Sequence, residues 1–169
     1  MYQKILVPLD GSQTAECVLP HVEAFVRGAF VKTLVFLRIV KPLPLIIYGD
    51  SLETFSPSAH IDSFTAKPEY WEKMEEERNS AAIEYLHQAT DRFKQYDVEI
   101  KCEVLQGNVA ETIANYAEKN NVDLIIIATH GRSGVTRWLM GSVADRILQS
   151  SHIPVLMIRA PADSDTKKD

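Results

Sequence analysis

The stretch "DLIIIAT", residues 123–129, is almost wholly apolar and decides the class of fold. A strand that helices cover on both faces carries such a continuous apolar run, whereas a strand with one wet face alternates. The run therefore predicts an inner strand of a parallel sheet. Parallel strands are joined by crossover connections that usually contain a helix, so we expect strands and helices to alternate along the chain.

The segments on either side of this run fit that expectation. Strand-like apolar runs lie at residues 4–10, 32–40, 98–105 and 154–159. Apolar residues at helical spacing predict helices in residues 12–29, 68–96, 108–120 and from Gly141 or Ser142 to residue 150. Pro20 lies inside the first helical pattern, so that helix is either kinked or begins there. Asn108, with Glu111 three residues later, predicts an N-cap. Residues 98–105 alternate, as a strand nearer an edge does. The series predicts an α/β protein with a mainly parallel sheet.

Bulk properties exclude several classes of protein. The 169 residues carry a net charge of −5 and no concentrated basic run, which argues against nucleic acid as a partner. No apolar run approaches the roughly 20 residues that span a membrane. The N-terminus reads as a strand and not as a secretory signal, so we expect a cytoplasmic protein. Cys17 and Cys102 form no CxxC motif and are expected to be reduced thiols.

The sequence predicts one domain, residues 1–160, and a flexible polar tail at residues 161–169. Residues 41–68 interrupt the alternation with four prolines and several serines. Such a length exceeds an ordinary connection. Two interpretations stay open: a lid that covers a ligand or a neighbouring subunit, or a disordered insertion.

Two loops at predicted strand ends carry polar chemistry. "PLDGS" places Asp10 just after the first strand, and "HGRSGVTRWLMGS" follows residue 129. Ligands of open parallel sheets bind beyond the carboxyl ends of the strands. Glycines allow close approach of backbone amides, and a helix N-terminus attracts phosphate. The second loop offers these features at Gly131, Gly134, Gly141 and Ser142, with Arg132 and Arg137 nearby. Asp10 suits a ribose hydroxyl or a metal that accompanies a polyphosphate. Alternatively, the glycines only shape the loop and Asp10 only caps the next helix.

Common catalytic signatures are missing from the sequence. There is no GxxxxGK[ST], no GxGxxG, no HExxH and no GxSxG. The five histidines have no metal-ligand spacing, and no serine has an identifiable histidine and aspartate partner. Trp71 and Trp138 are expected in core or subunit packing. We therefore assign no catalytic residue, and the metal ligands stay unknown.

The motifs resemble the universal stress protein family, in its nucleotide-binding branch. That branch carries Gly-x-x-Gly, nine residues, then Gly-Ser or Gly-Thr. Here "ATHG" is followed by "RSGVTRWLM" and "GS", so Ala128 replaces the first glycine. "VPLDGS" and "HIPVLMIR" are also similar to family signatures, and the resemblance extends from Tyr2 to Arg159. It implies a single-domain, open five-stranded parallel sheet with helices on both faces, Rossmann-like and similar to adenine nucleotide alpha hydrolases.

The resemblance also implies a ligand and its site. It implies ATP, accompanied by Mg²⁺, with the adenine near Val40 and Ile127 and the ribose near Asp10. The phosphates would lie on Gly131, Gly141, Ser142 and Val143. The complete expected site comprises Pro8, Leu9, Asp10, Val40, Ile127, Ala128, Gly131, Arg132, Gly141, Ser142 and Val143. The family is usually dimeric, and residues 154–159 could pair across a two-fold axis.

Three functions follow, in order of preference. The first is a dimeric, ATP-binding stress-response or regulatory module with at most slow hydrolysis. The second is a nucleotide-free structural or interaction dimer, in which Ala128 or residues 41–68 obstruct the pocket. The third is a slow Mg²⁺-dependent ATPase, or an adenylate- or phosphate-transferring protein, that uses Asp10.

Overall fold

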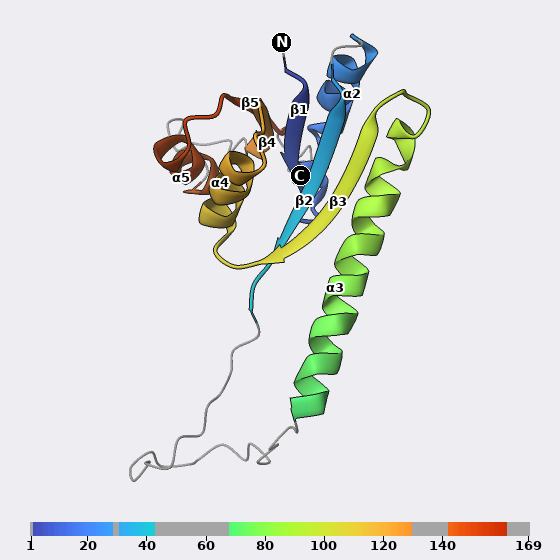
Figure 1. The fold of residues 1–169 in the computed structure, drawn as a ribbon, viewed down its shortest axis with the longest axis vertical. Helices are drawn as coiled ribbons and strands as arrows, with labels where there is room; N and C mark the ends of the chain where they lie inside the picture. The colour runs from blue at the N-terminus through green and yellow to red at the C-terminus, as the bar shows by residue number, and fades with distance from the viewer. Residues whose placement is uncertain (1, 29–30, 43–67, 130–141, 162–169) are drawn as a thin grey trace, which may run out of the picture.

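The computed structural model describes residues 2–28, 31–42, 68–129 and 142–161. In chain order the elements are β1 (Lys4–Pro8), α1 (Gln13–Glu16), α2 (Leu19–Arg27), β2 (Thr33–Val40), α3 (Pro68–Thr90), a 3-10 turn (Asp91–Phe93), β3 (Glu99–Gln106), α4 (Val109–Lys119), β4 (Leu124–Thr129), α5 (Ser142–Ser150) and β5 (Val155–Arg159). The predicted alternation of strands and helices is confirmed (Figure 1). Most of the 41–68 segment, the glycine-rich loop at 130–141 and the tail from 162 lie outside the described residues.

The sheet has five strands in the order β3-β2-β1-β4-β5, and every pair is parallel. The apolar run at 123–129 forms β4, an inner strand, as predicted. The alternating segment forms β3, which lies at an edge, also as predicted. The order reverses between β1 and β4, because β1 leads to β2 on one side while β4 leads to β5 on the other. Their carboxyl ends therefore border the switch point where ligands of such sheets bind.

Two hydrophobic clusters lie on opposite faces of the sheet. One joins Phe36 and Ile126 to apolar residues of α1, α2 and α3, and Leu86 and Phe93 are fully buried in it. The other joins Leu37 and Ile125 to α4 and α5. Successive residues of a strand point to opposite faces, so β1, β2 and β4 supply both clusters. Helices thus cover both faces, as predicted.

Local signals set several element ends. Pro20 occupies the first turn of α2, which resolves the choice in favour of a helix that begins near the proline. Ser12 caps α1, and its Oγ accepts a hydrogen bond from the Ala15 N–H at 3.0 Å. Asn108 caps α4 as predicted, accepting from the Glu111 N–H at 3.4 Å.

Helix α3 is long, and its N-terminal half projects past the carboxyl ends of β2 and β3 (Figure 1). Between Tyr70 and Thr90 its first buried residue is Ala82. Trp71 is half-buried near the projecting end, where its ring meets that of Tyr70 at a centroid separation of 5.8 Å. No helix in the described ranges combines the length and the apolar composition needed to cross a membrane. Cys17 and Cys102 are both free thiols, and burial raises the pKa of each.

Candidate functional site

The carboxyl edge of the sheet brings the two predicted loops to the same region. β1 and β4 are neighbours, and Leu6 pairs with Ile125. β1 leads into Asp10, while β4 leads into the glycine-rich segment and then α5. Asp10, Ile127 and Ser142 therefore come from elements that converge on the switch point. Gly131, Arg132 and Gly141 fall outside the described residues, so their predicted roles stay predictions.

Asp10 forms a tight turn at the tip of the first loop. Its Oδ1 accepts a hydrogen bond from the Ser12 N–H at 2.9 Å. Gly11, between them, has φ +87°, a left-handed conformation that glycine adopts without strain. The cap of α1 is Ser12 and not Asp10. Asp10 is exposed, and its Oδ2 has no hydrogen-bond partner among the described residues. The carboxylate is therefore available to a ligand.

Other predicted site residues contribute in different ways. Leu9 is only 3% exposed and packs in the core, so its backbone is the part that a ligand could reach. Ile127 is 7% exposed and belongs to the opposite cluster. Pro8, Val40 and Ala128 are half-buried at the strand ends. Ala128 packs against the core, so its methyl group lies partly in the interior.

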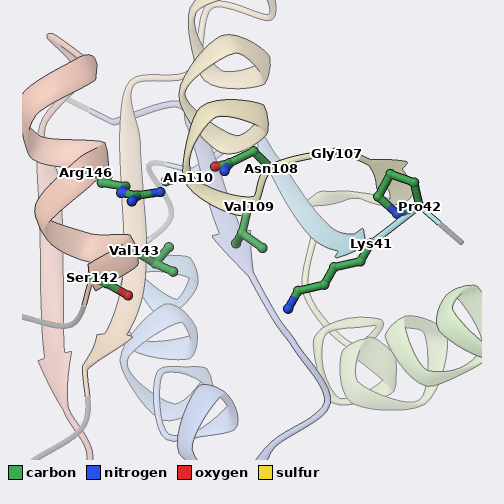
Figure 2. A pocket seen from close by; sticks show the side chains of 9 residues that line it. All are labelled: Lys41, Pro42, Gly107, Asn108, Val109, Ala110, Ser142, Val143 and Arg146. Carbon is green, nitrogen blue, oxygen red and sulfur yellow. The ribbon is translucent and has the colours of Figure 1, made fainter. Parts of the chain in front are cut away.

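A pocket of about 460 Å³ lies beside this edge, between the N-termini of α4 and α5 (Figure 2). Its lining comprises Lys41, Pro42, Gly107, Asn108, Val109, Ala110, Ser142, Val143 and Arg146. Val109 and Val143 supply apolar walls from the two helices, and both are half-buried. Lys41 and Arg146 extend toward the pocket from opposite sides, one from the end of β2 and the other from α5 (Figure 2).

The electrostatics of the pocket favour an anion. Among the described residues its lining contains two cations and no carboxylate, although the whole chain has a net charge of −5. Neither Lys41 nor Arg146 takes part in any ion pair within the described part of the chain. Two helix N-termini also face this space, and each adds partial positive charge. An elongated ligand with an apolar ring and an anionic group matches both the walls and the charges.

Backbone contacts tie the pocket to the sheet. The Gly107 N–H donates to the Val40 carbonyl at 3.2 Å, which joins the end of β2 to the β3–α4 loop. The Arg78 guanidinium of α3 donates to the Lys41 carbonyl at 2.9 Å. Val40 directly precedes Lys41 in the sequence, and Lys41 lines the pocket. The predicted Ser142 and Val143 line the pocket itself.

Sequence reasoning missed Lys41, Asn108 and Arg146 as pocket residues. Lys41 directly follows a predicted site residue, and Asn108 follows the end of a predicted strand, so the rule that identified Asp10 also reaches them. Arg146 had no comparable signal, because only the packing of α5 against α4 directs it toward the pocket. Within residues 2–28, 31–42, 68–129 and 142–161, no three His, Cys, Asp or Glu side chains cluster to hold a metal.

Comparisons with known proteins agree on one family. A model of the universal stress protein family matches residues 1–159. The chain is 29% identical to universal stress protein MJ0531 of Methanocaldococcus jannaschii over 95% of its own length and 84% of that protein.

Solved structures share the fold. The structure of protein MJ0577 superposes with a TM-score of 0.72 at 24% identity, covering 96% of this chain and 99% of that one. A universal stress protein family protein of Arabidopsis thaliana with AMP bound superposes with a TM-score of 0.58 at 15% identity, covering 98% and 97%.

Proposed function

As the chain belongs to the universal stress protein family, we propose that it binds ATP, accompanied by Mg²⁺, across the carboxyl edge of its sheet. The observation that carries the proposal is the convergence of three features. These are the available Asp10 carboxylate, the start of α5 at Ser142 and a pocket whose described lining holds two cations and no carboxylate. The AMP complex of the Arabidopsis relative supports an adenine nucleotide as the class of ligand.

Each part of ATP has a matching group on the chain. The Asp10 carboxylate suits the ribose hydroxyls, or the metal, since both are carboxylate partners. The N-terminus of α5, at Ser142 and Val143, suits phosphate oxygens. The base would lie near Val40, which is half-buried at the end of β2, and near the end of β4 at Ile127, whose side chain is largely in the core. Lys41 and Arg146 add positive charge beside the phosphates.

We further propose a homodimer that forms through β5. This strand lies at an edge of the sheet, and Met157 exposes 36% of its surface there. An edge strand presents unpaired backbone groups that a second chain can bond. The nucleotide would serve as a regulatory ligand with at most slow hydrolysis, in a protein that we expect in the cytoplasm.

Equilibrium titration of the purified chain with ATP and Mg²⁺ by calorimetry tests the proposal. The informative variant is Val143→Glu, which places a carboxylate in the pocket, and the matched control is Leu148→Glu on the exposed side of α5. We expect saturable binding by the wild type and the control, and strongly weakened binding by Val143→Glu. Circular dichroism verifies that both variants are folded.

Two outcomes would overturn the proposal. If the wild type binds no ATP at millimolar nucleotide, the nucleotide-free dimer becomes the better account. If Val143→Glu binds as tightly as the wild type, the nucleotide lies elsewhere. Phosphate release by the wild type and Asp10→Ala, measured in parallel, separates a regulatory ligand from a substrate, and we expect only slow release from both.

A further inference from the structure

A half-buried arginine lies beneath the loop that carries Asp10. Arg38, near the carboxyl end of β2, points to the face of the sheet covered by α1 and α3. Its guanidinium carbon lies 5.0 Å from the centroid of the Tyr85 ring, within the range of a cation–π interaction. A Cβ placed on Gly11 would lie 3.2 Å from Nη1 and 3.3 Å from Nη2 of Arg38. The guanidinium therefore packs against both the tyrosine ring and the Asp10 turn.

Tyr85 connects this arginine to the other side of the same turn. Its hydroxyl donates a hydrogen bond to Glu16 Oε1 at 3.0 Å. Burial, and then the bond to Glu16, raises the pKa of Tyr85 well above its usual value, so the hydroxyl keeps its proton. Glu16 lies on α1, where its N–H donates to the Ser12 carbonyl at 3.1 Å. Residues of β2, α3 and α1 thus bracket the turn from Asp10 to Ser12.

We propose that Arg38 and Tyr85 are positioning residues that orient the Asp10 carboxylate toward the ribose hydroxyls of the bound nucleotide. This inference rests on the proposed function. The turn contains a glycine and a single side-chain cap, and a carboxylate that selects a hydroxylated sugar needs a fixed direction. Arg38 packs against the turn at Gly11, and Tyr85 reaches the turn through Arg38 and Glu16, so both act through the turn. Helix α3, none of whose described side chains lines the pocket, thereby controls selectivity for the sugar.

The chain contains a natural control with the same three residue types. At the far end of α2, Arg27 Nε donates to the Tyr96 hydroxyl at 3.1 Å, and that hydroxyl donates to Glu23 at 2.6 Å. This second arginine–tyrosine–glutamate trio lies at the other end of α2 from the Asp10 turn and joins α2 to the segment that precedes β3. If such a trio had a purely structural role, Tyr85→Phe and Tyr96→Phe would have equal effects on the preference for a hydroxylated sugar.

The test measures sugar selectivity, which loss of stability alone does not change. Affinities for ATP and for 2′,3′-dideoxy-ATP, which lacks both ribose hydroxyls, are compared for each protein. We expect the wild type to prefer ATP by about tenfold, the value of one hydrogen bond to a charged group. Tyr85→Phe keeps the ring under Arg38 but removes the bond to Glu16. We expect the preference for ATP over dideoxy-ATP to fall from about tenfold to about fivefold or less. Arg38→Gln should reduce it likewise, whereas Arg38→Lys should restore part of it.

The remaining outcomes are decisive. Affinity for dideoxy-ATP should stay unchanged in Tyr85→Phe, and Tyr96→Phe should keep the full wild-type preference. If folded Tyr85→Phe and Arg38→Gln both retain the wild-type ratio, the inference is wrong while the proposed function stands. A wild type that binds both nucleotides equally also overturns the inference. A wild type that binds neither overturns the proposed function, and the inference with it. If Arg38→Gln does not fold, Tyr85→Phe still decides.

Discussion

Gly107 offers the sharpest test of the geometry around the pocket. It joins β3 to the cap of α4 with φ +145°, in a region that residues with a side chain rarely adopt. A Cβ at this position would lie 2.6 Å from Thr112 Oγ1. Gly107→Ala therefore introduces two separate penalties, one in the backbone and one against the side chain of Thr112.

The two penalties can be given magnitudes. Holding alanine in a sparsely populated backbone region costs about 1–3 kcal/mol. Thr112 must turn its Oγ1 away from the new methyl group, and a displaced side-chain torsion costs about 0.5–1.5 kcal/mol. We expect Gly107→Ala to lower the free energy of unfolding by about 2–4 kcal/mol in total, a large share of the usual 5–15 kcal/mol.

Urea unfolding, followed by far-ultraviolet circular dichroism, measures both parts. In a Thr112→Ala background the contact is absent, so Gly107→Ala should there cost about 1 kcal/mol less than in the wild type. Gly28→Ala is the matched control, because Gly28 has an ordinary helical φ of −70° and should tolerate alanine. A loss below about 0.5 kcal/mol, typical of neutral surface changes, would refute the backbone geometry. Equal losses in both backgrounds would refute the contact with Thr112.

Three further predictions concern the pocket and its supports. Lys41→Ala and Arg146→Ala should each weaken the binding of ATP by about threefold to tenfold and the binding of AMP by less, since ion-pair contributions grow with ligand charge. Equal losses of affinity for ATP and AMP would place these cations away from the phosphates. Asn108→Ala should destabilise the fold by about 1 kcal/mol in urea unfolding through loss of the α4 cap; an unchanged midpoint would contradict the capping bond. Burial, and then a hydrogen bond to Glu103, raises the pKa of Tyr116 in the folded protein. The tyrosine therefore contributes its full stabilisation below about pH 10, the pKa of an unfolded tyrosine, and loses it as the pH rises further. Between pH 8 and pH 11 the free energy of unfolding should therefore fall less in Tyr116→Phe than in the wild type. An equal fall in both proteins would show that Tyr116 does not cause it.

The sequence predicts the strands and helices well because each carries its own local signal. The apolar run of β4 indicates a strand covered by helices on both faces, and the alternation of β3 indicates a strand near an edge. Asn108 marks the start of α4. Pro20 left two choices, which only the packing of α2 against the sheet resolves. The order of the strands is a tertiary property, since it depends on which runs pair. The family resemblance implied five parallel strands, and the structure supplies their order.

The site was predictable where its residues lie at the ends of predicted elements. Asp10 follows the first strand and Ser142 begins a predicted helix, whereas Val143 came from the family resemblance. The structure brings the elements that carry them to the same edge of the sheet. Arg146 and Tyr85 could not be found in this way. Each lies within a helix whose pattern shows only which residues face the core, so its part in the site emerges from how the helix packs.

β2 illustrates how one strand can serve both layers of such a site. Its alternation sends Phe36 and Arg38 to the face covered by α1–α3, and Leu37 to the face covered by α4 and α5. Beyond its end, Lys41 lines the pocket on that second face. One strand end therefore places a cation on each side of the sheet.

Helix α3 contacts the end of β2 at both Arg38 and Lys41. Tyr85 packs against the Arg38 guanidinium, and Arg78 donates to the Lys41 carbonyl at 2.9 Å. The two contacts lie about two turns apart on α3, as their spacing of seven residues requires. Any movement of α3 along its axis must therefore disturb the Asp10 turn and the pocket together. Substitutions of Tyr85 and Arg78 should consequently alter nucleotide affinity, although neither residue lines the pocket.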